Sequence, residues 1–265
     1  MNQDDVKKKL LAIEDAPLEF SLIFSGKKSS KVNGLYKVES REIVIHNRNF
    51  HDKAGGDNLL LYTAIHEYAH HLHACSRGGS LSTRAHTAEF WAIFHGLLEK
   101  AATKKIYTDV FSTSPELAKL TELIRSKYLR NNGELVKEMG RHLLKAHKIC
   151  ADMNVRFSDY IDQMLRIPRT AANMAVRMYE YDLNPEVGAD NMRFLSGIRD
   201  SDDRKAAETA LLKGKSPDSV KIAVRAKAED PVHNLEKEKQ RLERTIAALT
   251  QRLEEVNLKL SENSP

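Results

Sequence analysis

The sequence predicts an α+β protein: a small three-stranded sheet with a helix hairpin, then an all-α region and a C-terminal coiled coil. Three observations lead to this fold class. Short β-branched segments lie between residues 20 and 46. From Ser114 onward every segment has helical patterning, and from about Val232 the apolar residues recur at heptad spacing. We therefore expect three domains, at residues 1–110, 114–230 and 231–265.

The composition is that of a globular core joined to solvated helices. Hydrophobic residues make up 41% of the chain, which is enough for a core, while 30% charged and 6% aromatic residues favour long solvated helices. The net charge of +5 is small against 42 basic and 37 acidic side chains. Charge alone therefore does not decide whether nucleic acid is a partner.

The cysteines and the apolar segments indicate the compartment. Cys75 and Cys150 lie far apart and form no CxxC pair, so neither a disulfide scaffold nor a thiolate metal site is expected. The N-terminal segment lacks an apolar core of signal-peptide length, and no later segment approaches the roughly 20 apolar residues that span a bilayer. We expect a soluble cytoplasmic protein with no membrane partner.

The first elements are a helix and three strands. Residues 3–15 have the pattern of a short amphipathic helix, which stops before Pro17. The segments FSLIF at 20–24, GLYKV at 34–38 and EIVIH at 42–46 then have the apolar and β-branched enrichment of strands. Together they predict the small sheet.

Two helices follow the sheet. The run LLLYTAIHEYAHHLHAC at 59–75 has no Pro or Gly and is too long for a typical strand, so it predicts a helix. Ser82 or Thr83 is then expected to cap a second helix over 85–101. The apolar residues of this second helix recur at helical spacing: Phe90, Ile93, Phe94, Leu97 and Leu98.

The first of these helices carries an HExxH motif at His66, Glu67 and His70. Residues i and i+4 project from one face of a helix, one turn apart, so the two imidazoles can bind one metal ion. Zinc lowers the pKa of a bound water towards about 7, and the adjacent glutamate can accept its proton as it attacks a carbonyl. The motif therefore predicts a catalytic Zn²⁺ site.

A catalytic zinc site has three protein ligands and an open position, so a third ligand is needed. His86 lies at the start of the second helix, where an antiparallel hairpin would bring it back to the first. The partial positive charge at that helix N-terminus would favour the neutral imidazole, which is the form that binds metal. Glu89, one turn later on the same face, remains the alternative ligand or a residue that supports the ligands.

Three further histidines lie near the motif. His73 shares a face with the two motif histidines, but three ligands from one straight helix cannot close around one ion, so we expect it at the surface or behind the ligands. His71 points elsewhere. His95 lies about half a turn around its helix from His86, as expected for a packed core histidine.

Four segments carry a resemblance to a known family: GLY, EIVIHN, LLLYTAIHEYAHHLHA and RAHTAEFWAIF, in this order within residues 15–105. They resemble the SprT-like zinc metallopeptidases and their YgjP-type relatives, whose pattern is HExxH followed by His-x-x-x-Phe, often with Trp next. The resemblance implies a zincin-like fold, a zinc ligand at His86 and a catalytic glutamate at Glu67. Thr87 stands where SprT proteins usually have Gly, and no cysteine-rich zinc ribbon follows, which leaves the subfamily open.

The region from 114 to 230 contains a candidate helix-turn-helix at residues 156–181. A tight turn at 166–168 joins two helices, and Pro168 can begin the second because its missing N–H has no helical partner there. The exposed face of this second helix carries side chains that can reach phosphates or base edges: Arg169, Thr170, Asn173 and Arg177. The helices expected in the whole region are 115–129, 133–153, 157–165, 169–181, 186–198, 201–213 and 216–228.

The run at 191–221 resembles the helical part of ParB-like DNA-binding proteins, where similar short helices follow a helix-turn-helix. Residues 155–230 carry about as many acidic as basic residues, however, so this region lacks the net positive charge that is typical of a DNA-binding protein. DNA binding, protein interaction and a structural extension all remain open for this region.

The last segment has two heptad core positions. Val232, Lys239, Ile246, Leu253 and Leu260 fall at one, and Leu235, Leu242, Leu249 and Val256 at the other. We expect a homodimer through this coiled coil, in the parallel form, with a single solvated helix as the alternative.

The resemblance implies a zinc-dependent endopeptidase that acts on a protein or peptide substrate. We expect the helical region to direct this peptidase to DNA or to DNA-bound proteins. Two alternatives remain. One is a DNA-associated binding or regulatory protein with a non-catalytic metal site, and the other is a metallopeptidase regulator that cleaves a repressor.

Overall fold

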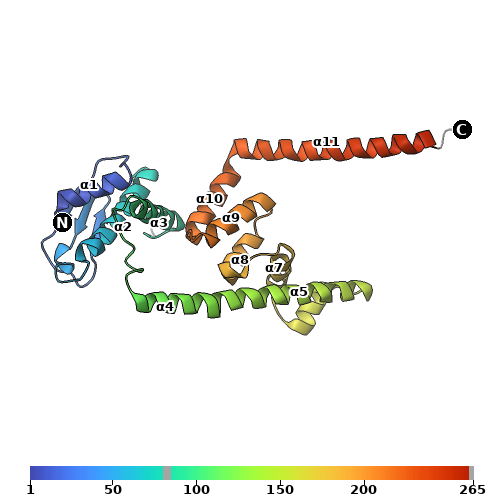
Figure 1. Cartoon of the computed structure of the whole chain (residues 1–265), viewed down its shortest axis with the longest axis horizontal. Helices are drawn as coiled ribbons and strands as arrows, with labels where there is room; N and C mark the ends of the chain where they lie inside the picture. Colours follow the sequence, from blue (N-terminus) through green and yellow to red (C-terminus); the bar gives the residue numbers. More distant parts are fainter. Residues whose placement is uncertain (80–84, 263–265) are drawn as a thin grey trace. The chain divides into compact units, whose positions relative to one another are not determined.

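The computed structural model describes residues 1–79 and 85–262 (Figure 1). The described chain is α+β, mostly helical with a small three-stranded sheet, as the sequence predicts. By its internal contacts the chain divides into two units, Met1–Val220 and Lys221–Pro265. The sheet, the helices packed on it and most of the helical region belong to the first unit.

The sheet is mixed. Its strands β1 (Ser21–Phe24), β2 (Gly34–Lys37) and β3 (Glu42–Ile45) lie in the order β1-β3-β2. β1 pairs with β3 in parallel, and β2 pairs with β3 antiparallel. Alternation along β3 turns the fully buried Ile43 and Ile45 to the core. β2 pairs with only one strand in this sheet, and it runs against the helix α2.

Three helices complete this part of the chain: α1 (Gln3–Ile13), α2 (Gly56–Ser76) and α3 (Ala88–Thr103), with a single 3₁₀ turn, η1 (Asn47–Asn49), after β3. α1 and α2 contact the strands, and α3 packs on α2 (Figure 1). Fully buried side chains from all of these layers form one core: Leu10, Ile43, Leu61, Tyr68 and Phe90. The HExxH helix is thus held between the sheet and α3.

α3 begins later than predicted. The Thr87 hydroxyl accepts the N–H of Phe90 at 3.3 Å and caps the helix, which starts at Ala88. His86 therefore lies in the turn before α3 and not inside its first turn. The predicted caps Ser82 and Thr83 lie outside the described residues.

The helical region opens with one continuous helical run, which corrects the predicted break near residue 131. α4 (Pro115–Leu123), the π-helical η2 (Ile124–Arg130) and α5 (Asn131–Asp152) follow one another with helical backbone at each junction. The predicted helices end at 129 and begin again at 133, so the predicted break lies just before Gly133. Gly133 instead serves packing, since an added Cβ would lie 2.8 Å from the Pro185 carbonyl oxygen.

The predicted helix-turn-helix has its two helices. α6 (Phe157–Tyr160) continues into the π-helical η3 (Ile161–Leu165), and Arg166 turns the chain with a φ of 54°. α7 (Arg169–Glu180) begins after Pro168 and packs on α5. The elements that follow are η4 (Pro185–Val187), α8 (Ala189–Ser196), α9 (Ser201–Leu212) and α10 (Pro217–Glu229).

The second unit contains the long helix α11 (Pro231–Glu262). All of its described side chains are exposed, and the side chain of Leu260 lies outside the described set. Among the described residues, no helix has both the length and the apolar character needed to cross a membrane.

Candidate metal centre

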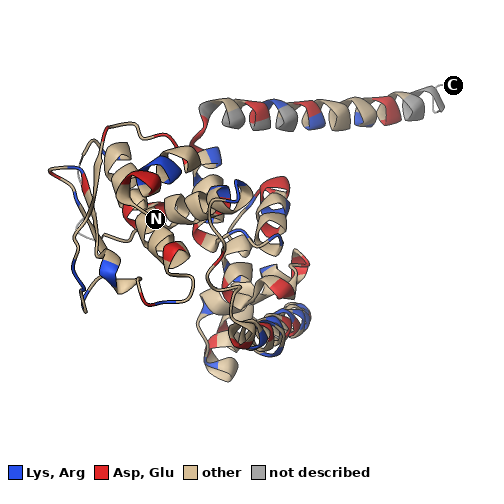
Figure 2. Cartoon of the chain, turned by 60° about the vertical axis from the view of Figure 1, so that its left-hand side comes forward, with Lys and Arg blue, Asp and Glu red and all other residues tan. Residues whose placement is uncertain are grey.

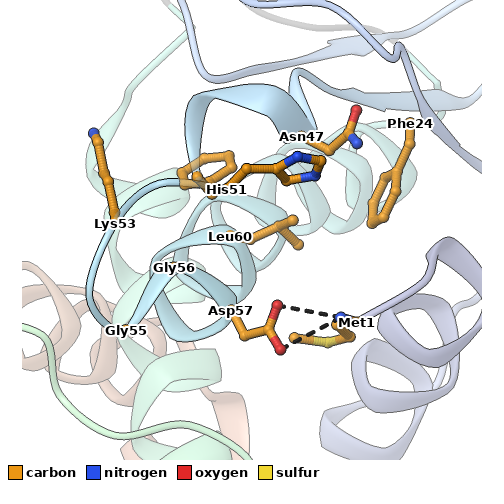
Figure 3. A pocket seen from close by; sticks show the side chains of 10 residues that line it. Met1, Phe24, Asn47, His51, Lys53, Gly55, Gly56, Asp57 and Leu60 are labelled. Atoms are coloured by element: carbon orange, nitrogen blue, oxygen red, sulfur yellow. Dashed lines mark hydrogen bonds and ion pairs between the residues drawn. The ribbon is translucent and has the colours of Figure 1, made fainter.

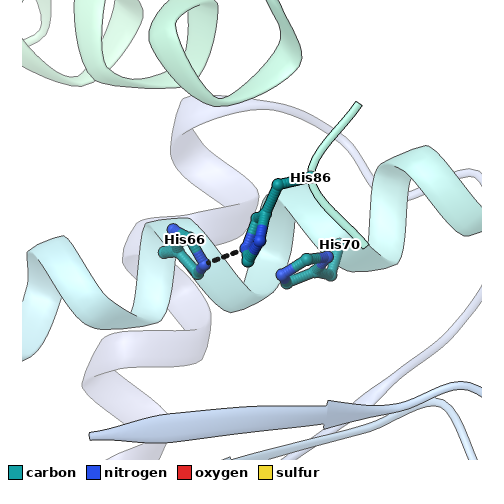
Figure 4. Close-up of side chains that lie close together, drawn as sticks. All are labelled: His66, His70 and His86. Carbon is teal, nitrogen blue, oxygen red and sulfur yellow. Dashed lines mark hydrogen bonds between the residues drawn. The ribbon is translucent and has the colours of Figure 1, made fainter. Parts of the chain in front are cut away.

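Three imidazoles meet where α2 faces the turn before α3 (Figure 4). His66 and His70 project from one face of α2, one turn apart, and their ring centroids are 5.1 Å apart. His86 reaches in from the turn, with its ring 5.1 Å from that of His66 and 4.9 Å from that of His70. α2 and the turn before α3 therefore bring the three predicted ligands together.

The spacing of the nitrogens fits a metal ion. One ligand atom from each ring lies within 4.8 Å of the others, and the Nε2 atoms of His66 and His86 are 3.1 Å apart. Nitrogens at about 2.0–2.1 Å from a tetrahedral ion are about 3.4 Å from one another. The buried Nδ1 of His70 also has no hydrogen-bond partner among the described residues. These three histidines could hold a metal ion.

The protonation state of the ligands suits this role. Burial in the first place, and the neighbouring imidazoles in the second, lower the pKa of His66 to about 4 and that of His70 to about 3. Both rings are therefore neutral near pH 7, which is the form that donates a lone pair to a metal.

Two aromatic residues of α3 hold the ligand rings in place. The ring of Phe90, which is fully buried, stacks on His70 at 4.2 Å between centroids and meets His86 edge-on at 4.7 Å. Trp91 stacks on His86 at 5.5 Å. From the sequence, Phe90 is expected only on the apolar face of α3, and no role is predicted for Trp91. Their spacing, four and five residues after His86, is the signal that could have indicated these contacts.

Glu67 directly follows His66 on α2, and its side chain occupies a confined space. Its side chain is buried, and this burial raises the pKa of the carboxyl group to about 7. β2 passes directly against it, because a Cβ added at Gly34 would lie 3.0 Å from Glu67 Cγ and 3.1 Å from Glu67 Oε1. The absence of a side chain at Gly34 thus leaves room for this carboxyl group.

Glu89 is not part of the three-histidine group. Its carboxylate acts on His73, whose pKa is lowered first by burial and then by Arg77 and is raised by Glu89. His73 is buried, with 1% of its surface exposed. Of the two positions predicted for it, at the surface or behind the ligands, the surface position is therefore wrong. Its Nε2 lies 3.5 Å from the Thr87 hydroxyl, next to the turn that carries His86.

The other two histidines have structural contacts. His71 is fully buried, where its ring nitrogens lie 3.0 Å from the Tyr36 hydroxyl and 3.0 Å from the Leu18 carbonyl oxygen. His95 is half-buried rather than a core residue, and it stacks on Trp91 at 5.7 Å.

A separate cavity of about 680 Å³ lies at the other end of the HExxH helix (Figure 3). Gly55 and Gly56 at the start of α2 line it together with Phe24, and Asp57 there accepts hydrogen bonds from the Met1 amino group at 3.2 and 3.4 Å. None of the three metal-site histidines lines this cavity. It is therefore distinct from the metal centre.

The four predicted DNA-contacting residues are all exposed on α7: Arg169, Thr170, Asn173 and Arg177. The Arg169 guanidinium is paired with Asp162 of η3, with Nε at 3.0 and 2.9 Å from the two carboxylate oxygens. Asn173 and Arg177 line a groove of about 420 Å³ between α5, α6 and α7. Figure 2 shows basic and acidic residues interspersed along these helices, consistent with the balanced net charge.

Comparisons of the chain with protein-family models, with curated proteins and with solved structures gave no match.

Proposed function

We propose that this protein is a zinc-dependent endopeptidase of the SprT-like type. The observation that carries the proposal is the meeting of His66, His70 and His86, two of which stand on the helix that also carries the buried Glu67. Three imidazole ligands are the donor set of a catalytic zinc site with one open position, and a carboxylate next to such a site can act on the bound water. When bound, zinc would polarise a carbonyl and lower the pKa of a water molecule there.

The protein's own groups would then carry the proton. Glu67 accepts a proton from the attacking water and delivers it to the departing amine nitrogen as the peptide bond breaks. Its place against β2 limits the movement of the Glu67 side chain. Phe90 and Trp91 keep the imidazole rings oriented.

The strand beside Glu67 offers a way to bind the substrate. β2 pairs with a single strand of the described sheet, so its other edge has backbone groups that an extended peptide can pair with. A peptide held there would pass close to the Glu67 carboxyl group. An extended protein segment is therefore the expected substrate form.

The Glu67→Gln variant tests the mechanism. Gln keeps the size of the side chain but cannot accept the proton, so peptidase activity should fall by at least about a hundredfold while the metal content is retained. Activity would be measured by proteolysis profiling of zinc-loaded protein, with Glu99→Gln on the exposed side of α3 as the matched control. Unchanged cleavage by Glu67→Gln would disprove the proposed mechanism. Wild type without activity would favour a regulatory protein with a non-catalytic metal site.

We further propose that the helical region directs the peptidase to DNA or to DNA-bound proteins. The support is the helix-turn-helix arrangement of α6, η3 and α7, which exposes polar and basic side chains on the second helix. A repressor on DNA is one substrate of this kind.

DNA binding should be sensitive to salt and independent of the metal site. The double variant Arg169→Ala/Asn173→Ala should weaken binding to a DNA duplex by about tenfold, measured by fluorescence anisotropy at low and at raised salt. His66→Ala should bind as wild type does. If no binding occurs at low salt, or if the double variant binds unchanged, the region is a protein-interaction module or a structural extension.

A further inference from the structure

α11 exposes an apolar stripe along its length. At one heptad core position stand Val232, Lys239, Ile246 and Leu253, and at the other stand Leu235, Leu242, Leu249 and Val256. The apolar members retain between 41% and 71% of their exposure. An isolated helix with such a stripe exposes many apolar side chains to water, which is unfavourable. We therefore expect the stripe to pack against a complementary surface.

We propose that residues 232–256 pair with the same segment of a second copy of this chain, and that the two helices run antiparallel. In this arrangement each residue at the first heptad core position faces a residue at the second core position of the other copy. Ile246 lies opposite Leu242 of the second copy, and Leu253 lies opposite Leu235. Lys239 lies opposite Leu249, where its stem covers apolar surface while its ammonium group reaches solvent. The contact extends over roughly 36 Å at 1.5 Å per residue.

The charges beside the stripe complement each other in this direction. Glu238 flanks the core in the first half of the segment and Arg252 flanks it in the second half, at the same heptad position. In an antiparallel pair these positions lie side by side, so Glu238 meets Arg252 of the second copy twice in each dimer. Flanking charges of this kind set the orientation of coiled coils. Figure 2 shows acidic and basic residues along α11.

A parallel pair would bring like charges together. Glu238 would flank Glu243 of the second copy twice, and the two Lys239 side chains would face each other in one core layer. The antiparallel pair has one like-charge contact, between the two Glu243 side chains at its midpoint. Lys239 offsets it, because its Nζ lies 3.8 Å from the Glu243 carboxylate of the same helix. The antiparallel direction therefore has the better charge pattern.

Disulfide formation across the dimer tests the direction. In the proposed alignment Thr245 lies beside Thr245 of the second copy, whereas in a parallel pair these residues lie on opposite flanks. Leu242 faces its own copy only in a parallel pair. Under mild oxidation Thr245→Cys should therefore give a covalent dimer, and Leu242→Cys should not.

The controls separate these outcomes from background oxidation. Arg244 lies at the same level as Thr245 but on the outer face of the helix, so the Arg244→Cys variant should give no covalent dimer. The wild-type protein, whose cysteines are Cys75 and Cys150, should give none either. Thr245 is exposed, so the substitution leaves folding intact. The proposal is overturned if wild type is a monomer at micromolar concentration, if Leu242→Cys forms the covalent dimer, or if Thr245→Cys fails to form it.

A charge swap gives a second readout on the native cysteine background. Arg252, which pairs with Glu255 of its own helix at 2.7 Å, also contacts Glu238 of the second copy in the proposed dimer. Arg252→Glu should weaken dimerisation by about tenfold in sedimentation analysis, since two attractive contacts become repulsive. Adding Glu238→Arg should restore the wild-type dissociation constant. A dimer that neither change affects would contradict the antiparallel alignment.

Discussion

Gly34 controls the space available to the Glu67 carboxylate. An added Cβ would lie 3.0 Å from Glu67 Cγ and 3.0 Å from Thr63 Cγ2, closer than side chains tolerate without moving. Gly34→Ala should therefore displace Glu67 while leaving the three histidines in place. We expect peptidase activity to fall by about tenfold to a hundredfold with metal content unchanged.

The matched control for this variant is Gly96→Ala. Gly96 lies within α3, and a Cβ added there meets nothing within 4 Å. It should leave activity unchanged in the same peptide-cleavage assay. If Gly34→Ala retained wild-type activity, the contact between β2 and Glu67 would have no part in catalysis.

Some residues of the site can be predicted from the sequence, and others cannot. His66, Glu67 and His70 follow from one local rule, the spacing of side chains along a helix face. The sequence favoured His86 over Glu89 but left both open, because the choice depends on where α3 begins, and the Thr87 cap sets that point. The contact of Gly34 with Glu67 joins two elements that are distant in the chain, so no local pattern indicates it.

At the scale of elements, close approach of α5 and α7 depends on Gly140. A Cβ at this position would overlap the backbone carbonyl of Ala175. Gly140→Ala should therefore push the two helices apart and destabilise the helical region by about 1–3 kcal/mol, despite the better helix propensity of Ala. Chemical denaturation followed by circular dichroism measures the effect. Gly96→Ala should be neutral or stabilising, and a stabilised Gly140→Ala would show that the helices do not pack this closely.

The element boundaries show which signals the sequence carries. Helical periodicity located α2, α7, α9 and α10 to within a turn, because each buries one face. The break predicted near residue 131 was wrong because the glycines of α5 serve packing against other elements and do not end the helix. The strand order β1-β3-β2 could not be predicted, since pairing between short strands is a tertiary property.

At the scale of the whole molecule, the sequence correctly predicted the α+β class and the helical character of everything after the first sheet. These features follow from composition and period, which local sequence determines. Binding of the helical region to DNA and of α11 to a second copy of the chain depends on exposed surfaces, and both remain proposals. The peptidase proposal rests on one premise, that α2 and the turn before α3 hold a metal ion.

Metal stoichiometry in purified variants tests this premise most directly. Elemental analysis after zinc loading should give near one equivalent per chain for wild type, Glu67→Gln and Glu89→Ala, because none of these changes removes an imidazole. His66→Ala, His70→Ala and His86→Ala should each lose the metal. Full metal content in His86→Ala together with its loss in Glu89→Ala would contradict the three-histidine centre.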